Sequence, residues 1–294
     1  MGPVARWKCA AMIFTAQRRR AAAVVFLVGV VAVAAGCTSA APAPRQNPSA
    51  GVGDVTEAIT LSPELTHLHG LQLSADRTLL AGTHTGLAAI TPAGATTAVG
   101  TSDDDLMGLS GIPGTDVVFA SGHPGRSSSA PNPLGLRAST DGGRTWQDRS
   151  LVGEVDFHVL AADEGLLIGS DGGARLLIST DAGHTWGAGA QLVPRTLAIS
   201  ADGIWAATDD GIVWRSTDGG RSFARIAAPT IALLAGSGSA LWAIDADGYA
   251  WQHFENRPWL KHSWIGAPHA LTVAPDGLAY AASTTQLWVL QPLT

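Results

Sequence analysis

The sequence predicts an all-β protein, a six-bladed β-propeller, with seven blades as the alternative. Three observations predict this fold. An eight-residue motif occurs three times, and its first serines, Ser139, Ser179 and Ser216, are spaced 40 and 37 residues apart. Short β-type runs separated by Gly and Asp turns extend this period over six units. The chain that follows the N-terminal apolar segment, roughly 240 residues, is long enough to bury one core of this kind.

The first 36 residues have the composition of an export signal. Three arginines at 18–20 precede an uncharged apolar stretch at 21–35, which is shorter than the about 20 apolar residues of a membrane-spanning helix. The stretch ends in Ala-Ala-Gly directly before Cys37. Small residues before a cysteine resemble a lipobox, after which lipoprotein signal peptidase cleaves. We therefore expect residues 1–36 to be a lipoprotein signal peptide and Cys37 to carry lipid. An uncleaved anchor helix and an ordinary signal peptide are the alternatives.

Residues 37–53 are rich in Ala, Pro, Ser and Gly and show no hydrophobic period, which predicts a flexible tether. The propeller then covers residues 54–294. These boundaries place the protein outside the cytoplasm, on the outer face of the cytoplasmic membrane. Both cysteines, Cys9 and Cys37, precede the propeller, so we expect no disulfide within it.

The charge of the chain excludes one class of partner. The whole chain has a net charge of −6, and residues 1–36 contain five basic and no acidic residues, so the rest has 13 basic and 24 acidic residues. An acidic surface of this kind does not attract nucleic acid. Attachment to a membrane must come from the lipid, because no basic patch is present to bind anionic head groups. We expect a monomer that binds a small molecule, a glycan or a protein.

The repeated octapeptide has the chemistry of a tight hairpin turn. An Asp side chain can accept hydrogen bonds from backbone N–H groups ahead of it, and Gly supplies positive φ. The terminal aromatic ring can pack between neighbouring sheets. The structural positions are Ser139, Asp141, Gly143, Trp146, Ser179, Asp181, Gly183, Trp186, Ser216, Asp218, Gly220 and Phe223.

These octapeptides resemble the Asp-box, S-x-D-x-G-x-T-W, of the BNR-repeat and sialidase-like propellers. That resemblance implies that each octapeptide joins the third and fourth strands of a four-stranded blade and has a structural role. Secreted BNR-repeat proteins labelled glycosyl-hydrolase-like resemble the chain over most of residues 60–225. The stretches that carry this resemblance are 67–71, 83–87, 121–125, 132–136 and 155–158. The resemblance implies a fold but little mechanism.

The last unit has room for only three strands before the chain ends. Val55–Leu61 alternates weakly and can supply the missing outer strand. Such closure would tie the two ends of the ring together and leave no open sheet edge. A seventh blade would require the irregular segment at 125–132 to be more than a loop.

In a propeller, the starts of the innermost strands and the loops between second and third strands share one face. The predicted register places most of the nine histidines there, with two aspartates and a methionine. Imidazole, carboxylate and thioether groups can bind a transition metal or transfer protons. A polar ligand site without metal and simple bonding to backbone carbonyls are the alternatives. The candidate residues are His67, His69, His84, Asp105, Met107, His123, Asp156, His158 and His269.

The composition disfavours sialidase chemistry. The resemblance would imply three arginines, a tyrosine–glutamate pair and an aspartate. Only Arg195 stands at the start of an innermost strand, and Tyr249 and Tyr280 fall within strands of the predicted blades. A different glycan hydrolase using Asp105 and Asp156 stays open. A scaffold for protein assembly is a further alternative, because photosystem assembly-factor propellers resemble this chain in fold. The leading hypothesis is a lipid-anchored propeller that binds a ligand or metal ion at the channel mouth.

Overall fold

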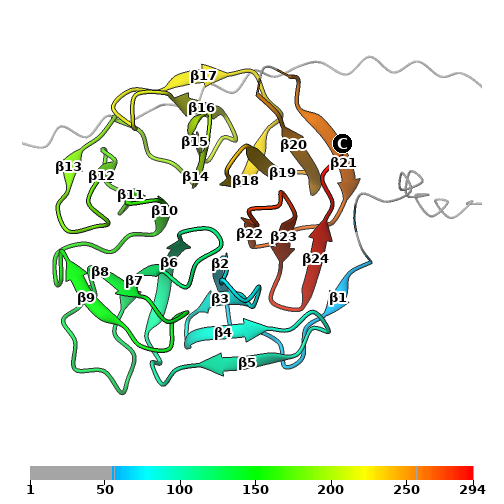
Figure 1. Ribbon diagram of the computed structural model, residues 1–294. Helices are drawn as coiled ribbons and strands as arrows, with labels where there is room; N and C mark the ends of the chain where they lie inside the picture. The colour runs from blue at the N-terminus through cyan, green and yellow to red at the C-terminus, as the bar shows by residue number, and fades with distance from the viewer. Residues whose placement is uncertain (1–54, 56, 256, 294) are drawn as a thin grey trace, which may run out of the picture. The chain divides into compact units, whose positions relative to one another are not determined.

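The computed structural model describes Val55 and residues 57–255 and 257–293. The expected signal peptide, Cys37 and the tether lie outside these described residues. The regular structure of the described chain is entirely β, and six antiparallel four-stranded sheets form a six-bladed propeller (Figure 1). The predicted fold class is therefore confirmed, with six blades rather than seven. Across the described ranges, no helix is long and apolar enough to cross a membrane.

Each of the first three blades follows the chain from the innermost strand outward. Blade 1 contains β2 (Leu68–Leu73), β3 (Leu79–Thr83), β4 (Gly86–Ile90) and β5 (Thr96–Val99). Blade 2 contains β6 (Asp105–Gly111), β7 (Val118–His123), β8 (Leu136–Ser139) and β9 (Gln147–Ser150). Blade 3 contains β10 (Val159–Asp163), β11 (Leu166–Ser170), β12 (Leu177–Ser179) and β13 (Gly187–Ala188).

The next two blades repeat this order, and the last blade differs from it. Blade 4 contains β14 (Thr196–Ser200), β15 (Gly203–Ala207), β16 (Val213–Ser216) and β17 (Ala224–Ile226). Blade 5 contains β18 (Ile231–Ser237), β19 (Ala240–Asp245), β20 (Tyr249–His253) and β21 (Leu260–Trp264). Blade 6 contains β22 (Ala270–Val273), β23 (Ala279–Ala282), β24 (Gln286–Leu290) and β1 (Ile59–Thr60).

The outer strand of blade 6 comes from the other end of the propeller, as predicted. Ile59 pairs with Leu287 across an antiparallel ladder, and Val55 forms an isolated bridge with Leu290. The Leu61 N–H donates to the Thr285 carbonyl at 2.8 Å. In Figure 1 the blue strand β1 lies beside the red strand β24. The ring is thus closed by hydrogen bonds between segments more than 220 residues apart, and blade 6 has no open outer edge on β24.

Antiparallel order fixes which connections lie at which end of the central channel. We call the end where the innermost strands begin the mouth. The loops between second and third strands are also at the mouth. The turns between third and fourth strands, which contain the octapeptides, lie at the opposite end.

The octapeptide turns share one hydrogen-bond pattern. In the first, Ser139 Oγ donates to Asp141 Oδ1 at 2.7 Å and accepts from the Gly143 N–H at 2.8 Å. The Thr145 N–H then donates to Asp141 Oδ1 at 2.9 Å. The second and third copies repeat these three bonds within 0.1 Å. Each Asp carboxylate therefore accepts hydrogen bonds from residues before and after it in the chain. These bonds take the place of the strand-to-strand backbone hydrogen bonds that a turn lacks.

The aromatic ring that ends each octapeptide packs against the preceding blade. Trp146 of blade 2 contacts the cluster around Leu80 and Leu87 of blade 1. Trp186 of blade 3 packs in the cluster with Phe119 and Leu136 of blade 2, and Phe223 of blade 4 packs beside Ile168 of blade 3. These rings therefore join neighbouring blades near the face opposite the mouth.

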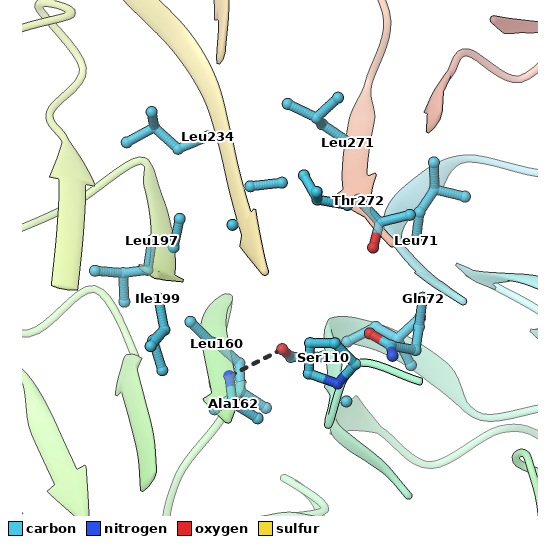
Figure 2. Close-up of a pocket in the computed structure, with 18 residues that line it drawn as sticks. Leu71, Gln72, Ser110, Leu160, Ala162, Leu197, Ile199, Leu234, Leu271 and Thr272 are labelled. Atoms are coloured by element: carbon cyan, nitrogen blue, oxygen red, sulfur yellow. Dashed lines mark hydrogen bonds between the residues drawn. The ribbon is translucent and has the colours of Figure 1, made fainter. Parts of the chain in front are cut away.

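A leucine from every innermost strand borders the channel, and we call these six residues the leucine ring: Leu71, Leu109, Leu160, Leu197, Leu234 and Leu271. Each pairs with an alanine or glycine of the second strand, namely Ala81, Ala120, Gly169, Ala206, Ala243 and Ala281. The small partner leaves room for the leucine of the neighbouring blade. Figure 2 shows Leu71, Leu160, Leu197, Leu234 and Leu271 around the opening on the side away from the mouth.

Candidate functional site

The mouth of the channel contains a pocket of about 240 Å³. Its upper wall comes from the residues two positions before each leucine of the leucine ring. We call these equivalent positions the mouth ring: His69, Met107, His158, Arg195, Ala232 and His269. All of them except Ala232 line the pocket. Five blades therefore contribute the same position to the wall of the pocket, and blade 5 contributes Leu233 and Leu234.

Three positions of the mouth ring, His69, Met107 and Ala232, are the extra residues of β-bulges, and the first two of them line the pocket. In blade 1, Leu68 pairs with Thr83 and Gly70 with Gly82, so His69 is the extra residue of a β-bulge. In blade 2 the same register shift leaves Met107 as the extra residue. A bulge locally bends and twists a strand and redirects a side chain, which is why bulges are common beside functional sites.

Three imidazoles gather at the blade 1 side of the mouth, and we call His67, His69 and His84 the three-histidine cluster. One ring nitrogen from each lies within 4.8 Å of the other two. His84 Nε2 is 2.7 Å from His67 Nδ1, and the His67 and His69 rings stack with centroids 4.8 Å apart. His67 has φ of 20°, a backbone conformation that residues with a Cβ adopt at a cost.

Asp105, which begins the innermost strand of blade 2, contacts this cluster. Its Oδ2 accepts a hydrogen bond from His84 Nδ1 at 2.7 Å. Its Oδ1 lies 3.5 Å from His69 Nε2, and neither of these two buried atoms has a hydrogen-bond partner. Orphaned buried polar atoms usually indicate a missing water or ion. With Nδ1 of His84 bonded to Asp105, Nε2 is the nitrogen that His84 turns toward the other imidazoles.

The environment keeps His69 in the form that binds metals. Burial lowers the pKa of His69, the neighbouring imidazoles His84, His67 and His158 lower it further, and Asp105 opposes them. A neutral imidazole has a free lone pair, whereas an imidazolium has none. A neutral His69 offers a lone pair to a metal ion near neutral pH without first losing a proton.

A second group of polar residues lies on blades 2 and 3. Asp156 Oδ2 is 2.7 Å from His158 Nε2 and 3.2 Å from His123 Nε2. His123 Nδ1 faces Asn132 Oδ1 at 2.8 Å, so the ring is bonded at both nitrogens. Asp156 Oδ1 is buried and has no hydrogen-bond partner. The carboxylate orients His158 at the pocket wall and links it to His123.

The nine predicted residues thus separate into three groups. His69, Met107, His158 and His269 line the pocket itself. His67, His84 and Asp105 surround His69 on the blade 1 side. His123 and Asp156 support His158.

Two residues of the mouth were not among the predicted site residues. Arg195 lines the pocket, and Asn132 holds His123. The signal for Arg195 is its spacing, because it precedes Leu197 by two residues as His69 precedes Leu71. Asn132 lies in a loop outside the repeat, and its only sequence signal is that it begins the stretch 132–136 that resembles the BNR-repeat proteins.

The residues of sialidase chemistry are not assembled at the mouth within the described chain. Tyr280 Oη accepts a hydrogen bond from Arg77 at 3.1 Å, beside the Arg77–Asp276 ion pair on the β2–β3 turn side. The Tyr249 ring lies under the Lys261 ammonium, 3.4 Å from the ring centroid. Arg144 and Arg221 donate to backbone carbonyls inside their own octapeptides.

No protein-family model and no curated protein matches the chain in sequence. Solved structures do match in fold. A gluconolactonase of Xanthomonas campestris is 14% identical, with a TM-score of 0.61 over 80% of this chain and 89% of that one. A streptogramin B lyase is 15% identical, with a TM-score of 0.55 over 81% of this chain and 98% of that one.

A third similar structure, described as YCF48 bound to D1 peptide, is 14% identical, with a TM-score of 0.54 over 85% of this chain and 99% of that one. Sequence identities this low show that the proteins share a fold, and they do not show a shared activity. The comparisons and the topology agree that the chain forms a β-propeller.

Proposed function

We propose that this protein is a lipid-anchored propeller of the outer face of the cytoplasmic membrane that binds a divalent transition-metal ion at the channel mouth. The observation that carries the proposal is the three-histidine cluster with Asp105 behind it. Anchoring rests on the sequence around Cys37 alone. The octapeptide turns support membership of the BNR-repeat propellers, since their bonding matches the role that resemblance implies.

The donor set favours a borderline-soft metal such as Zn²⁺, Ni²⁺ or Cu²⁺. Imidazole nitrogens suit these ions, whereas Mg²⁺ and Ca²⁺ take oxygen ligands. Ligand nitrogens of one zinc ion lie about 3.4 Å apart in tetrahedral geometry. The nitrogens of the cluster now lie within 4.8 Å of one another, with His84 and His67 at 2.7 Å, so a bound ion would require the rings to rotate. Three protein ligands leave a coordination position for water or a ligand, as in catalytic zinc sites.

The carboxylate that contacts His84 supports the same assignment. A metal-bound histidine usually donates its other N–H to a carboxylate, which fixes the tautomer and the ring. Asp105 holds this place behind His84. The orphaned His69 Nε2 and Asp105 Oδ1 add two buried polar atoms that lack a partner.

A test uses the full chain purified in detergent and stripped with a chelator. Zn²⁺, Ni²⁺ and Cu²⁺ are each added in excess, removed by desalting and measured by elemental analysis. We expect about one tightly held ion per chain for at least one metal and its loss in the His69→Ala/His84→Ala double variant. The control is His184→Ala, which changes an exposed histidine in the second octapeptide at the opposite end. Metal retention by the double variant, or none in wild type, would contradict the proposal.

A second function, hydrolysis of a glycan, is favoured by one observation. Asp156 orients His158 at the pocket wall with a 2.7 Å contact, and a carboxylate-oriented imidazole is a suitable general acid or base. Nitrophenyl glycosides test this function, and the activity should disappear in His158→Ala. Two of the similar structures are named as enzymes, which makes this assay worthwhile.

A further inference from the structure

Met107 is the only methionine of the propeller. The chain has three methionines, and the other two, Met1 and Met12, fall in the expected signal peptide. Methionine usually fills gaps in hydrophobic cores, because its side chain is flexible and apolar. Met107 is instead half-buried and lines the mouth pocket together with His69 and His158. Core packing therefore does not explain its place among imidazoles.

Blade 1 packs directly against blade 2 beside Met107. A Cβ added to Gly70, the residue after His69, would lie 2.9 Å from the Leu109 Cβ of β6. Only glycine fits there, so β2 lies against β6 at the level of the mouth ring. His69 and Met107 occupy equivalent positions of these two strands and line the same pocket. Their side chains are therefore neighbours on the pocket wall.

Blade 3 packs against the other side of blade 2 in the same way. A Cβ added to Gly108 would collide with the carbonyl oxygen of Phe157, the residue before His158. Burial lowers the pKa of His69 most, and His158 is among the imidazoles that lower it further, so the two rings interact. Figure 1 shows β2, β6 and β10 next to one another around the channel. Met107 therefore stands between His69 and His158.

A thioether beside imidazoles discriminates between metal ions. Thioether sulfur is a soft ligand that suits Cu(I), whereas Zn²⁺ in proteins takes thiolate, imidazole and carboxylate ligands. His69 supplies a nitrogen for such an ion, because its Nε2 is buried and has no hydrogen-bond partner. The sulfur of Met107 thus adds to the mouth a donor that Cu(I) uses and Zn²⁺ does not.

We propose that the mouth also binds reduced copper, Cu(I), with the Met107 thioether and the His69 imidazole as ligands. The inference rests on the proposed function for the role of His69 and adds a ligand specific to Cu(I). Zn²⁺ and Cu(I) then compete for His69. Met107 is the residue that distinguishes the two ions.

The test compares wild type with Met107→Leu, which nearly keeps the volume of the side chain and removes the sulfur. The full chain in detergent is titrated anaerobically with Cu(I) against a chromophoric Cu(I) chelator, and separately with Zn²⁺. We expect Met107→Leu to weaken Cu(I) binding at least about tenfold, the smallest loss expected when a support of a metal ligand is removed. Its Zn²⁺ affinity should equal that of wild type. His184→Ala, an exposed histidine at the opposite end, is the control and should bind both ions as wild type.

A second measurement observes the side chain of Met107 itself. In protein with isotope-labelled methionine methyl groups, the NMR signal of Met107 is identified by its absence from Met107→Leu. Cu(I) is diamagnetic, so its binding shifts this signal without erasing it, and we expect a larger shift with Cu(I) than with Zn²⁺. An equal shift with both ions, or none with Cu(I), would overturn the proposal. Unchanged Cu(I) affinity in Met107→Leu or in His69→Ala would overturn it as well.

The two metal proposals fail in different ways. Binding of Zn²⁺ together with Cu(I) binding that does not depend on Met107, or with no Cu(I) binding, contradicts only this inference. Cu(I) binding that depends on both Met107 and His69, without binding of any divalent ion, supports this inference and contradicts only the divalent site.

Discussion

Asp105 contacts two imidazoles of the three-histidine cluster with its two oxygens. Oδ2 accepts from His84 Nδ1 at 2.7 Å, and Oδ1 lies 3.5 Å from His69 Nε2. A single carboxylate from blade 2 thereby holds the His84 ring by a hydrogen bond and faces the His69 ring, both of which blade 1 presents. The site depends on the docking of these two blades as much as on its own residues.

Replacing Asp105 tests this dependence. Asp105→Asn keeps the size of the side chain and removes its charge, so we expect Zn²⁺ affinity to fall about 10- to 100-fold, as for other supports of metal ligands. Competition with a chromophoric chelator measures the affinity. Asp171→Asn changes an exposed carboxylate on a mouth loop of blade 3 and serves as control. An Asp105→Asn protein with wild-type affinity would show that the carboxylate does not position the ligands.

The proposed membrane anchor depends on one residue, Cys37. If Cys37 is lipidated, Cys37→Ala should lose the mass of the lipid and leave the membrane fraction, because stable anchoring needs the acyl chains. Mass spectrometry and membrane fractionation measure the two effects. Full membrane retention with an intact N-terminus would indicate an uncleaved helix instead.

The octapeptide aromatic rings should contribute to stability through contacts between blades. Trp186 is half-buried, stacks near Phe157 with ring centroids 4.8 Å apart and donates to Ser150 Oγ. We expect Trp186→Ala to lower the free energy of unfolding by about 3 kcal/mol, measured by urea denaturation. Trp264, which is 54% exposed, is the control and should change it by less than about 1 kcal/mol. Metal content should stay the same in both variants, since Trp186 lies at the end opposite the mouth and Trp264 lies on the outermost strand of blade 5, away from the channel.

The octapeptide aspartates should make the fold sensitive to acid. Hydrogen bonds from Thr145 and Ser139 lower the pKa of Asp141 from its usual 3.8 to about 2, and the same bonds lower the pKa of Asp181 and Asp218. A group whose pKa is lower in the folded state stabilises the fold above its unfolded pKa. This stabilisation is lost as the pH falls through the folded pKa.

We therefore expect the melting temperature to fall between about pH 4 and pH 2. The triple variant Asp141→Asn/Asp181→Asn/Asp218→Asn should melt lower than wild type at pH 7 and show a flatter decline in this window. Calorimetry at a series of pH values measures both quantities. An equally steep decline in the triple variant would assign the acid sensitivity to other carboxylates.

Closure of the ring can be tested at Gly94. A Cβ at this position would lie 2.1 Å from the Thr60 carbonyl of β1. Gly172 has nearly the same φ, +82° against +84°, with nothing within 4 Å. We expect Gly172→Ala to cost about 1 kcal/mol for the backbone conformation alone, and Gly94→Ala to cost at least about 2 kcal/mol more because it displaces the closing strand. Equal unfolding free energies in urea would show that β1 contributes little to closure.

The repeat made the fold predictable, since the octapeptides mark the same turn in three blades and their period locates the other three. The weak alternation of Val55–Leu61 sufficed to predict closure because blade 6 lacked a strand. For the site residues, the sequence predicted only that they lie on one face of the propeller. Register alone placed His67, Asp105 and Asp156 at equivalent positions.

The local geometry of the mouth was not predictable from that register. The β-bulges at His69 and Met107 depend on pairing with the next strand, and a period of two residues does not encode them. The bond from Asp105 to His84 crosses from one blade to another, so it requires the packed structure. Asn132 was missed for a different reason: the loop that contains it has no counterpart in the other blades.

The closure of blade 6 also determines how the propeller would bear a mechanical load. Force transmitted along the chain from residues before Val55 acts first on β1, whose ladder with β24 has two residue pairs and one further bridge. Force along the strand loads these bonds together, in shear. A ladder of only two residue pairs, as short as that between β12 and β13, is therefore the first pairing expected to break when the N-terminal side of the propeller is pulled.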